Sequence, residues 1–306
     1  MLNSANIRNL VYTSIAFAIM LAYFLVIIKR NGAGAARMII AGTAISLTLV
    51  LISYGLKFLS ATGAASAFLM GCNIFGMGGM AWAVPLLTFF LSTSILSKMG
   101  RSRKERYDLI FDKGSQRDAG QVLANGGLAW LLIILYSFGP HPVLYFAFLA
   151  AIAAVQADSW STEIGTMVRD PRPYSIATFK PVPPGTSGGV TWIGTLGGLA
   201  GALLISASAW ASAPSTMRGL GVWISVVMIG LAGLLGSLVD SILGATLQAR
   251  YYDPVREKVT ERAFRQTPDG PARNQQIAGH AWFTNDVVNF GCSVAGAAVA
   301  LLLLSL

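Results

Sequence analysis

The sequence has 306 residues, of which 54% are hydrophobic and only 11% are charged. Soluble domains carry about 25% charged residues, so this composition excludes an ordinary water-soluble globule and indicates that a lipid bilayer is the solvent. The net charge of +9 arises from 22 Lys and Arg against 13 Asp and Glu. In a membrane protein such an excess is typical of basic loops that face the cytoplasm and anionic lipid head groups. We therefore expect the lipid bilayer as a partner and no nucleic acid partner.

Nine apolar segments have about the length of a membrane-crossing helix, which is about 20 residues. They are residues 10–28, 38–56, 61–76, 81–97, 121–138, 142–158, 189–210, 220–245 and 285–305. The first is longer than a usual signal-peptide core, so we predict a retained span. Segment 61–76 is the weakest, because it is short and rich in Gly and Ala. The sequence predicts an all-α fold, a polytopic transmembrane helical bundle of about nine spans (eight to ten).

The polar part of the chain is concentrated in three segments, residues 98–120, 159–188 and 246–284, which contain 7, 3 and 6 Lys or Arg residues. Two predicted spans separate each segment from the next, so the positive-inside rule places all three in the cytoplasm. Lys29, Arg30 and Arg37 also favour the cytoplasm. If both 61–76 and 81–97 cross the membrane, these three residues are exceptions on the other face. If residues 58–97 cross only once, Lys29, Arg30 and Arg37 lie on the cytoplasmic face and are not exceptions. We favour the first arrangement, with the N-terminus inside.

Segment 246–284 is the only sizeable stretch expected outside the membrane. Residues 248–252 and 258–262 flank Asp253-Pro254, which predicts a small β-hairpin. Thr267-Pro268-Asp269-Gly270-Pro271 marks a second turn. Cys72 and Cys292 lie inside apolar stretches, so we interpret both as small buried hydrophobic residues without a disulfide or metal role.

Four acidic residues lie in or beside apolar segments, namely Asp158, Glu163, Asp240 and Asp286. A carboxylate near hydrocarbon is costly by several kcal/mol unless it is paired or bound to metal, so such residues indicate function. For Asp158, capping a helix end is a competing interpretation. All four fall at predicted cytoplasmic helix ends, where carboxylates suit Mg²⁺ that also binds substrate phosphates. The sequence therefore predicts a magnesium site formed by these four residues.

Polar neighbours accompany these carboxylates. Thr162 shares a helical face with Asp158, and Ser241 follows Asp240 directly. Asn285 and Asn289 also share one helical face. These side chains are candidates for binding substrate oxygens.

A run of Pro, Gly and hydroxyl residues, Lys180 to Thr191, precedes the predicted span that begins near residue 189. Its glycines and hydroxyl groups form a plausible anion-binding nest, to which Lys180 adds a positive charge. The nest residues are Gly185, Thr186, Ser187, Gly188 and Gly189. The competing interpretation is an ordinary turn in which Ser187 or Thr186 caps the following helix. Neither a Walker A motif nor G-x-G-x-x-G is present, so a soluble nucleotide-binding fold is not indicated.

Five ordered blocks resemble the membrane family that contains transmembrane protein 19 and the phytyl-phosphate kinase of plants and cyanobacteria. The blocks are residues 121–127, 157–165, 180–190, 233–246 and 285–289, and the resemblance covers roughly residues 40–306. Residues 1–37 are then an additional N-terminal span, and 38–306 form a single integral membrane domain. Some family members carry Asn at the position of Asp286, which weakens its assignment as a metal ligand.

The resemblance implies a kinase that converts an isoprenoid monophosphate into the diphosphate, with CTP or another nucleoside triphosphate as donor. In that scheme Asp158, Glu163 and Asp240 hold Mg²⁺, and the nest with Lys180 binds nucleotide phosphates. Arg117 binds the lipid phosphate. The amides that would orient oxygens are Gln121, Asn125, Asn285 and Asn289. We expect a bacterial-type cell membrane with the active face in the cytoplasm.

Two other functions fit parts of the pattern. A transporter of a phosphorylated lipid or small anion would also contain intramembrane carboxylates and helices broken by glycine. A CDP-alcohol phosphotransferase is hinted at by Gly236, Asp240 and Ala249-Arg250, but position 244, where a further aspartate is required, is Gly. A purely structural scaffold is a third and weaker alternative.

Overall fold

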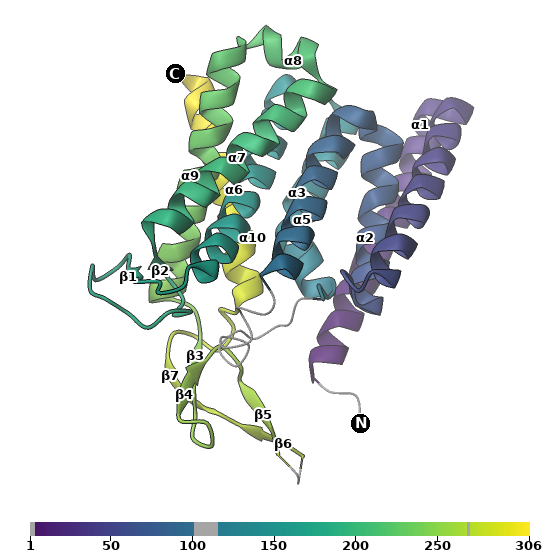
Figure 1. The fold of residues 1–306 in the computed structure, drawn as a ribbon. Helices are drawn as coiled ribbons and strands as arrows, with labels where there is room; N and C mark the ends of the chain where they lie inside the picture. The colour runs from purple at the N-terminus through teal and green to yellow at the C-terminus, as the bar shows by residue number, and fades with distance from the viewer. Residues whose placement is uncertain (1–3, 101–115, 268–269) are drawn as a thin grey trace.

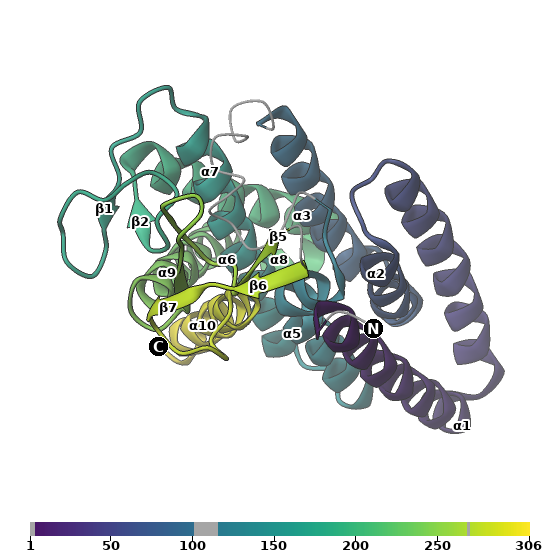
Figure 2. The same ribbon diagram turned by 90° about the horizontal axis from the view of Figure 1, so that it is seen from below.

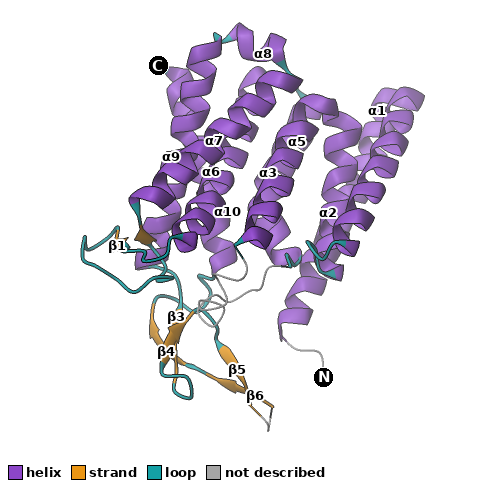
Figure 3. Ribbon diagram, in the orientation of Figure 1, coloured by secondary structure: helices purple, strands orange, loops and turns teal. Residues whose placement is uncertain are grey.

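A computed structural model describes residues 4–100, 116–267 and 270–306. Long helices form one bundle, and short strands extend from one end of it (Figure 1, Figure 3). The helices are α1 (Ser4–Gly55), α2 (Ala61–Asn73), the π-helical turn η1 (Ile74–Gly78), α3 (Gly79–Met99), α5 (Ala119–Phe138), α6 (Pro142–Met167), α7 (Trp192–Ser212), the short α8 (Pro214–Gly219), α9 (Val222–Thr246) and α10 (Asn285–Ser305). The all-α bundle predicted from the sequence is confirmed.

Seven continuous helical stretches of the described chain are long and apolar enough to cross a membrane, and two of these, of 42 and 39 residues, are each long enough for two crossings. The first is divided at Gly32, whose φ of 66° is not helical. The chain reverses direction there (Figure 1, Figure 2). The second is divided at Gly79, with φ of 58°, between η1 and α3. Counting the halves separately gives nine passes through the described bundle, in agreement with the prediction of about nine.

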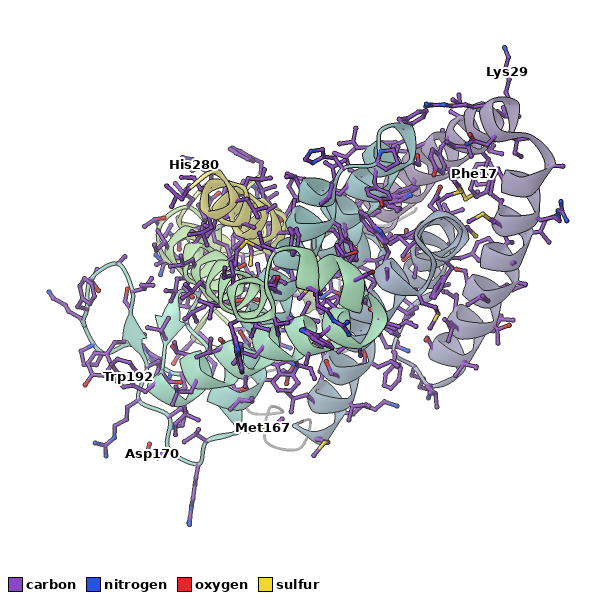
Figure 4. All side chains as sticks on the ribbon, turned by 90° about the horizontal axis from the view of Figure 1, so that it is seen from above. Phe17, Lys29, Met167, Asp170, Trp192 and His280 are labelled. Carbon is purple, nitrogen blue, oxygen red and sulfur yellow. The ribbon has the colours of Figure 1, made fainter. Side chains whose placement is uncertain are left out.

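The two ends of the bundle carry different chemistry. The strands, the loop between α6 and α7 and the starts of α5 and α10 lie at the end where the N-terminus lies (Figure 1). At the opposite end, Arg30 donates a hydrogen bond of 3.2 Å to the carbonyl oxygen of Phe138, the last residue of α5. Lys29 extends from that same end (Figure 4). Lys29 and Arg30 are therefore on the opposite face from the polar segments, as the favoured arrangement requires.

Helix α6 is the central helix of the bundle, buried continuously from Tyr145 to Ala157. Small residues allow its neighbours to approach closely. A Cβ atom placed on Gly236 of α9 would lie 2.5 Å from the Cβ of Ala154, and one placed on Gly296 of α10 would lie 2.6 Å from the same atom. Helix α6 also continues nine residues beyond the predicted span end, so Asp158 lies within a helix and does not cap one.

The strands form three small antiparallel sheets. In one, β3 (Arg250–Asp253) lies between β4 (Lys258–Thr260) and β7 (Gln275–Ala278). In the second, β5 (Phe264–Thr267) pairs with β6 (Gly270–Arg273). The third joins β1 (Tyr174–Ser175) to β2 (Gly189–Val190). The hairpin predicted around Asp253-Pro254 is confirmed, and the second predicted turn joins β5 to β6, although residues 268–269 lie outside the described chain. Strand β7 was not predicted.

Candidate active site

A cavity of about 510 Å³ opens at the end of the bundle where the polar segments gather. Helices α3, α5, α6, α7, α9 and α10 contribute to its wall, together with the loop between α6 and α7 and the strand region after α9. Of the predicted site residues, those that line the cavity are Arg117, Gln121, Asn125, Asp158, Thr162, Glu163, Gly185, Thr186, Ser187, Gly188, Gly189, Asp240, Ser241, Asn285 and Asn289. Residues more than 170 positions apart in the sequence therefore meet at one site.

Asp158 of α6 and Asp240 of α9 form an acidic pair in this cavity. Their carboxyl groups lie close enough to interact, and Glu261 adds a further negative charge near both. Asp240 lies six residues before the end of α9, which is about 9 Å along a helix that rises about 1.5 Å per residue. Its Oδ2 atom is buried and accepts no hydrogen bond from the described residues. A buried carboxylate oxygen beside a second acid is a favourable position for a cation.

The carboxylates do not form a complete metal cage by themselves. No group of three His, Cys, Asp or Glu side chains within the described chain is arranged to hold a metal ion. Glu163 lines the same cavity and its charge acts on Arg117. The acidic pair thus fits Mg²⁺ in the form in which proteins commonly bind it, with one or two carboxylates and the remaining ligands from water and substrate phosphates.

Arg117 lines the same cavity and is held by side chains of α3. Its guanidinium group donates hydrogen bonds to the hydroxyl groups of Thr93 (2.5 Å) and Ser94 (3.2 Å). The group also lies 5.6 Å and 5.4 Å from the ring centroids of Phe89 and Phe90, a cation–π arrangement. Desolvation lowers the pKa of Arg117 to about 10, and the negative charge of Glu163 opposes this shift. Arg117 therefore remains a fixed positive charge at neutral pH.

The Gly-rich loop of residues 184–189 lies over the C-terminal part of α9. A Cβ atom on Gly188, whose φ is +75°, would lie 2.5 Å from the Cβ of Ala245, so only glycine fits this contact. The amide N–H groups of Thr186 and Gly189 donate to the carbonyl oxygens of Pro183 and Thr186 and close two turns. Ser187 donates a hydrogen bond of 2.7 Å to Glu261 Oε1.

Helix α7 begins after this loop and is capped by Thr191, which accepts a hydrogen bond of 3.0 Å from the amide of Gly194. The alternative prediction, that Ser187 or Thr186 caps the helix, is therefore wrong. The reason is that residues 189–190 first pair with β1 as a strand, which separates the loop from the helix start. On α5, Gln121 lines the cavity but its Oε1 also accepts from the amide of Asp118 in a capping box.

Two predicted residues lie elsewhere. The side chain of Lys180 is exposed and does not line the cavity, because its backbone closes a turn with Ser175 outside the wall. Asp286 lies in the first turn of α10 and is buried, but it does not line the cavity either. Lys180 and Asp286 therefore do not line the cavity with the other predicted site residues.

The sequence reasoning missed Glu261 and Arg262, which line the cavity from the segment between β4 and β5. Buried Asn274 holds that segment, since its Nδ2 atom donates a hydrogen bond of 2.9 Å to the carbonyl oxygen of Arg262. Two charged residues in a hydrophilic loop resemble solvated surface in the sequence. Only the hairpin pairing brings them back over the bundle end.

Comparison with known proteins gives the family. A model described as integral membrane protein DUF92 matches residues 44–297. The chain belongs to this integral membrane family. Among curated relatives, protein PGR of Arabidopsis thaliana is 35% identical over 80% of this chain and 89% of its own length.

More distant relatives extend the same match. An uncharacterized membrane protein of Methanocaldococcus jannaschii is 31% identical over 61% of this chain and 74% of its own length. The chloroplastic protein VTE6 of Arabidopsis thaliana is 24% identical over 80% of this chain and 65% of its own length. No solved structure matches. The family matches confirm a multi-pass integral membrane protein.

Proposed function

We propose that this protein transfers a phosphoryl group from a nucleoside triphosphate, CTP being the first candidate, to an isoprenoid monophosphate at the membrane interface. The observation that carries the proposal is the Asp158–Asp240 pair, which lines one cavity together with Arg117 and a Gly-rich loop. The sequence resemblance to the phytyl-phosphate kinases supports the same reaction. We further propose that the active face is cytoplasmic in a bacterial-type cell membrane, since the polar, basic segments share that end.

The charges of the cavity support a reaction between phosphates and a divalent cation. Four acidic residues and two arginines line it, namely Asp158, Glu163, Asp240, Glu261, Arg117 and Arg262. When ionised they sum to −2, which by itself repels phosphate. Bound Mg²⁺ would neutralise this excess and the charge that develops on the transferred phosphoryl group. Asp158 and Asp240 are the residues that would hold it.

The acceptor in this proposal is already a phosphate monoester, which is largely ionised at neutral pH. Little proton abstraction is then needed, so the protein acts by positioning and charge stabilisation. Arg117, fixed by two hydroxyl groups and two aromatic rings, binds one phosphate. The amides of Asn125, Asn285 and Asn289 line the cavity and orient phosphate oxygens by donating hydrogen bonds.

The location of the cavity fits one water-soluble and one lipid substrate. The strand region extends beyond the end of the helix bundle (Figure 3), and we propose that a nucleotide reaches the cavity from there, past Glu261 and Arg262. The Leu234 and Leu238 side chains of α9 line the part within the bundle. An isoprenoid chain suits these apolar residues, and its phosphate would lie at the level of the acidic pair.

The test uses detergent-purified protein, radiolabelled CTP or ATP, a panel of prenyl monophosphates and assays with and without Mg²⁺. We expect Mg²⁺-dependent formation of prenyl diphosphate, and we expect Asp240→Asn to lose it. Asp253→Asn is the control, since Asp253 is a buried acid of the hairpin that does not line the cavity. Full activity of Asp240→Asn would reject the metal assignment. Uptake of labelled phosphate compounds by proteoliposomes, without any transfer, would favour the transporter instead.

A further inference from the structure

The loop between α6 and α7, residues 168–191, extends sideways from the bundle. It leaves the bundle near the ends of the helices and runs outward at that level, whereas the strands β3 to β6 extend away from the bundle (Figure 1). The view from below shows the same outward projection beyond α7 and α9 (Figure 2). In a bilayer, the space beside the ends of membrane-spanning helices contains lipid head groups and the upper acyl chains. With the bundle in a bilayer, the loop would lie at the level of the lipid head groups.

Phe179 lies at the tip of this loop, where its apolar ring is exposed, which is unfavourable in water. Its side chain is 81% exposed. Its φ of +54° is uncommon for a bulky residue and carries a conformational cost. The turn is nevertheless closed by two backbone hydrogen bonds, from the Phe179 amide to the Ser175 carbonyl oxygen (2.8 Å) and from the Ser175 amide to the Lys180 carbonyl oxygen (2.9 Å). The backbone thus holds an apolar ring outward, which a lipid contact would explain.

Further exposed apolar side chains lie on α7, which begins where the loop ends. Trp192, at the start of α7, is 86% exposed, and tryptophan is enriched at membrane interfaces. It lies on the same outer side of the molecule as Asp170 of the loop (Figure 4). Leu196, one turn further along α7, is 63% exposed and faces outward as well. Exposed apolar side chains therefore occur both at the loop tip and on α7, where the loop ends.

The charge of the loop matches an anionic membrane surface. It contains the basic residues Arg169, Arg172 and Lys180 and one acidic residue, Asp170. Asp170 pairs with Arg172 at 3.6 Å, and both side chains remain more than three-quarters exposed. Lys180 directly follows Phe179 and is exposed. An apolar tip beside basic residues is typical of segments that bind anionic lipid surfaces.

We infer that the tip of the α6–α7 loop is a membrane-anchoring element, with Phe179 inserted among the acyl chains and Lys180, Arg169 and Arg172 at anionic head groups. The inference does not depend on the proposed function. Its consequence for the site is direct, because residues 184–189 at the other end of the loop form a wall of the cavity. Anchoring the tip holds that wall at the depth of lipid head groups.

The experiment measures the depth of a nitroxide label in vesicles that contain the full chain. Cys72 and Cys292 are only 1% and 0% exposed, so a label attaches to a newly introduced cysteine. The labelled variants are Ala177→Cys in the loop, with Phe179 intact, and Ala177→Cys combined with Phe179→Ser. Glu257→Cys at the β3–β4 turn is the water-exposed reference, and Leu196→Cys is the lipid-exposed reference. Collision rates with oxygen, which enters the membrane, and with a water-soluble nickel chelate give the depth.

We expect the label at position 177 to resemble the label at 196 more than the label at 257, with higher oxygen and lower nickel accessibility. Phe179→Ser should shift it toward the values at 257, and phosphatidylglycerol should deepen it relative to phosphatidylcholine alone. A label at 177 as accessible to nickel as the label at 257 would overturn the inference. An unchanged depth after Phe179→Ser would exclude the assigned role of Phe179, and equal depth in both lipids would exclude the role of the basic residues.

Discussion

Asp240→Asn should stabilise the folded protein while it removes activity. Two unit charges about 4 Å apart repel each other by about 4 kcal/mol at an effective dielectric constant of about 20. Proton sharing relieves part of this repulsion in close carboxyl pairs. The amide also avoids the penalty of a buried charge near hydrocarbon. Oδ2 of Asp240 accepts no hydrogen bond from the described residues, so the substitution breaks few favourable contacts of the carboxylate. We expect the free energy of unfolding to rise by about 1–3 kcal/mol.

The assay is thermal unfolding of purified protein in detergent with EDTA. A gain of this size corresponds to a rise of about 2–12 °C in the midpoint, since 1 kcal/mol shifts large domains by about 2–4 °C. Added Mg²⁺ should raise the midpoint of the wild type, because a ligand at about ten times its Kd stabilises by about 1.4 kcal/mol. The variant should lose this response.

The control substitution Asp253→Asn should lower the free energy of unfolding, whereas Asp240→Asn should raise it. Asp253 accepts hydrogen bonds from the amides of Val255 (3.0 Å) and Arg256 (3.3 Å) and pairs with the Arg256 side chain at 3.4 Å. Asp253→Asn should therefore destabilise the hairpin by about 1–3 kcal/mol. A lower midpoint for Asp240→Asn in EDTA would contradict this prediction, since it would mean that the Asp240 carboxylate is well compensated without metal.

Three further substitutions test the packing and the walls of the site. Gly236→Ala should destabilise the bundle by about 1–3 kcal/mol in the thermal unfolding assay, because its Cβ atom would overlap Ala154. Gly127→Ala is the control and should not destabilise the protein in that assay, because the space around Gly127 is open. Arg117→Gln should raise the KM for the phosphate acceptor at least about tenfold, as expected for loss of a charge-assisted contact of about 1.5–3 kcal/mol; an unchanged KM would place the acceptor elsewhere. Ser187→Ala removes the hydrogen bond to Glu261 and should weaken nucleotide binding, measured by isothermal titration, with a smaller effect on acceptor binding.

The sequence was informative where the physics is local. About 20 apolar residues predict a span whatever surrounds them, and basic loops predict a shared face, which the structure has at one end of the bundle. The weak segment 61–76 crosses because the π-helical turn η1 lengthens it to Gly78. Asp158 and Asp240, 82 positions apart, were both predicted as site residues because an acid near hydrocarbon is informative on its own, and both line the cavity.

Tertiary placement was less accessible to sequence reasoning. Lys180 was assigned to the nest because it is near Gly185 in sequence, but the turn at Ser175 directs its side chain out of the cavity wall. Conversely, Arg262 looked like solvated surface, and the pairing of β3 with β4 and the contact of Asn274 bring it over the cavity. Both cases depend on side-chain direction within short loops, which neither composition nor periodicity specifies.

We propose that phosphoryl transfer between a nucleotide and an isoprenoid phosphate takes place in the cavity lined by α6 and α9. Its most direct measurement follows the label from γ-phosphate-labelled CTP, or ATP, in the presence of Mg²⁺, purified protein and a prenyl monophosphate. The proposed function predicts that the label appears in the lipid as the new terminal phosphate, only with Mg²⁺ and only with intact Asp158 and Asp240. Label that remains in the nucleotide, or appears only as inorganic phosphate with every acceptor tried, would contradict it.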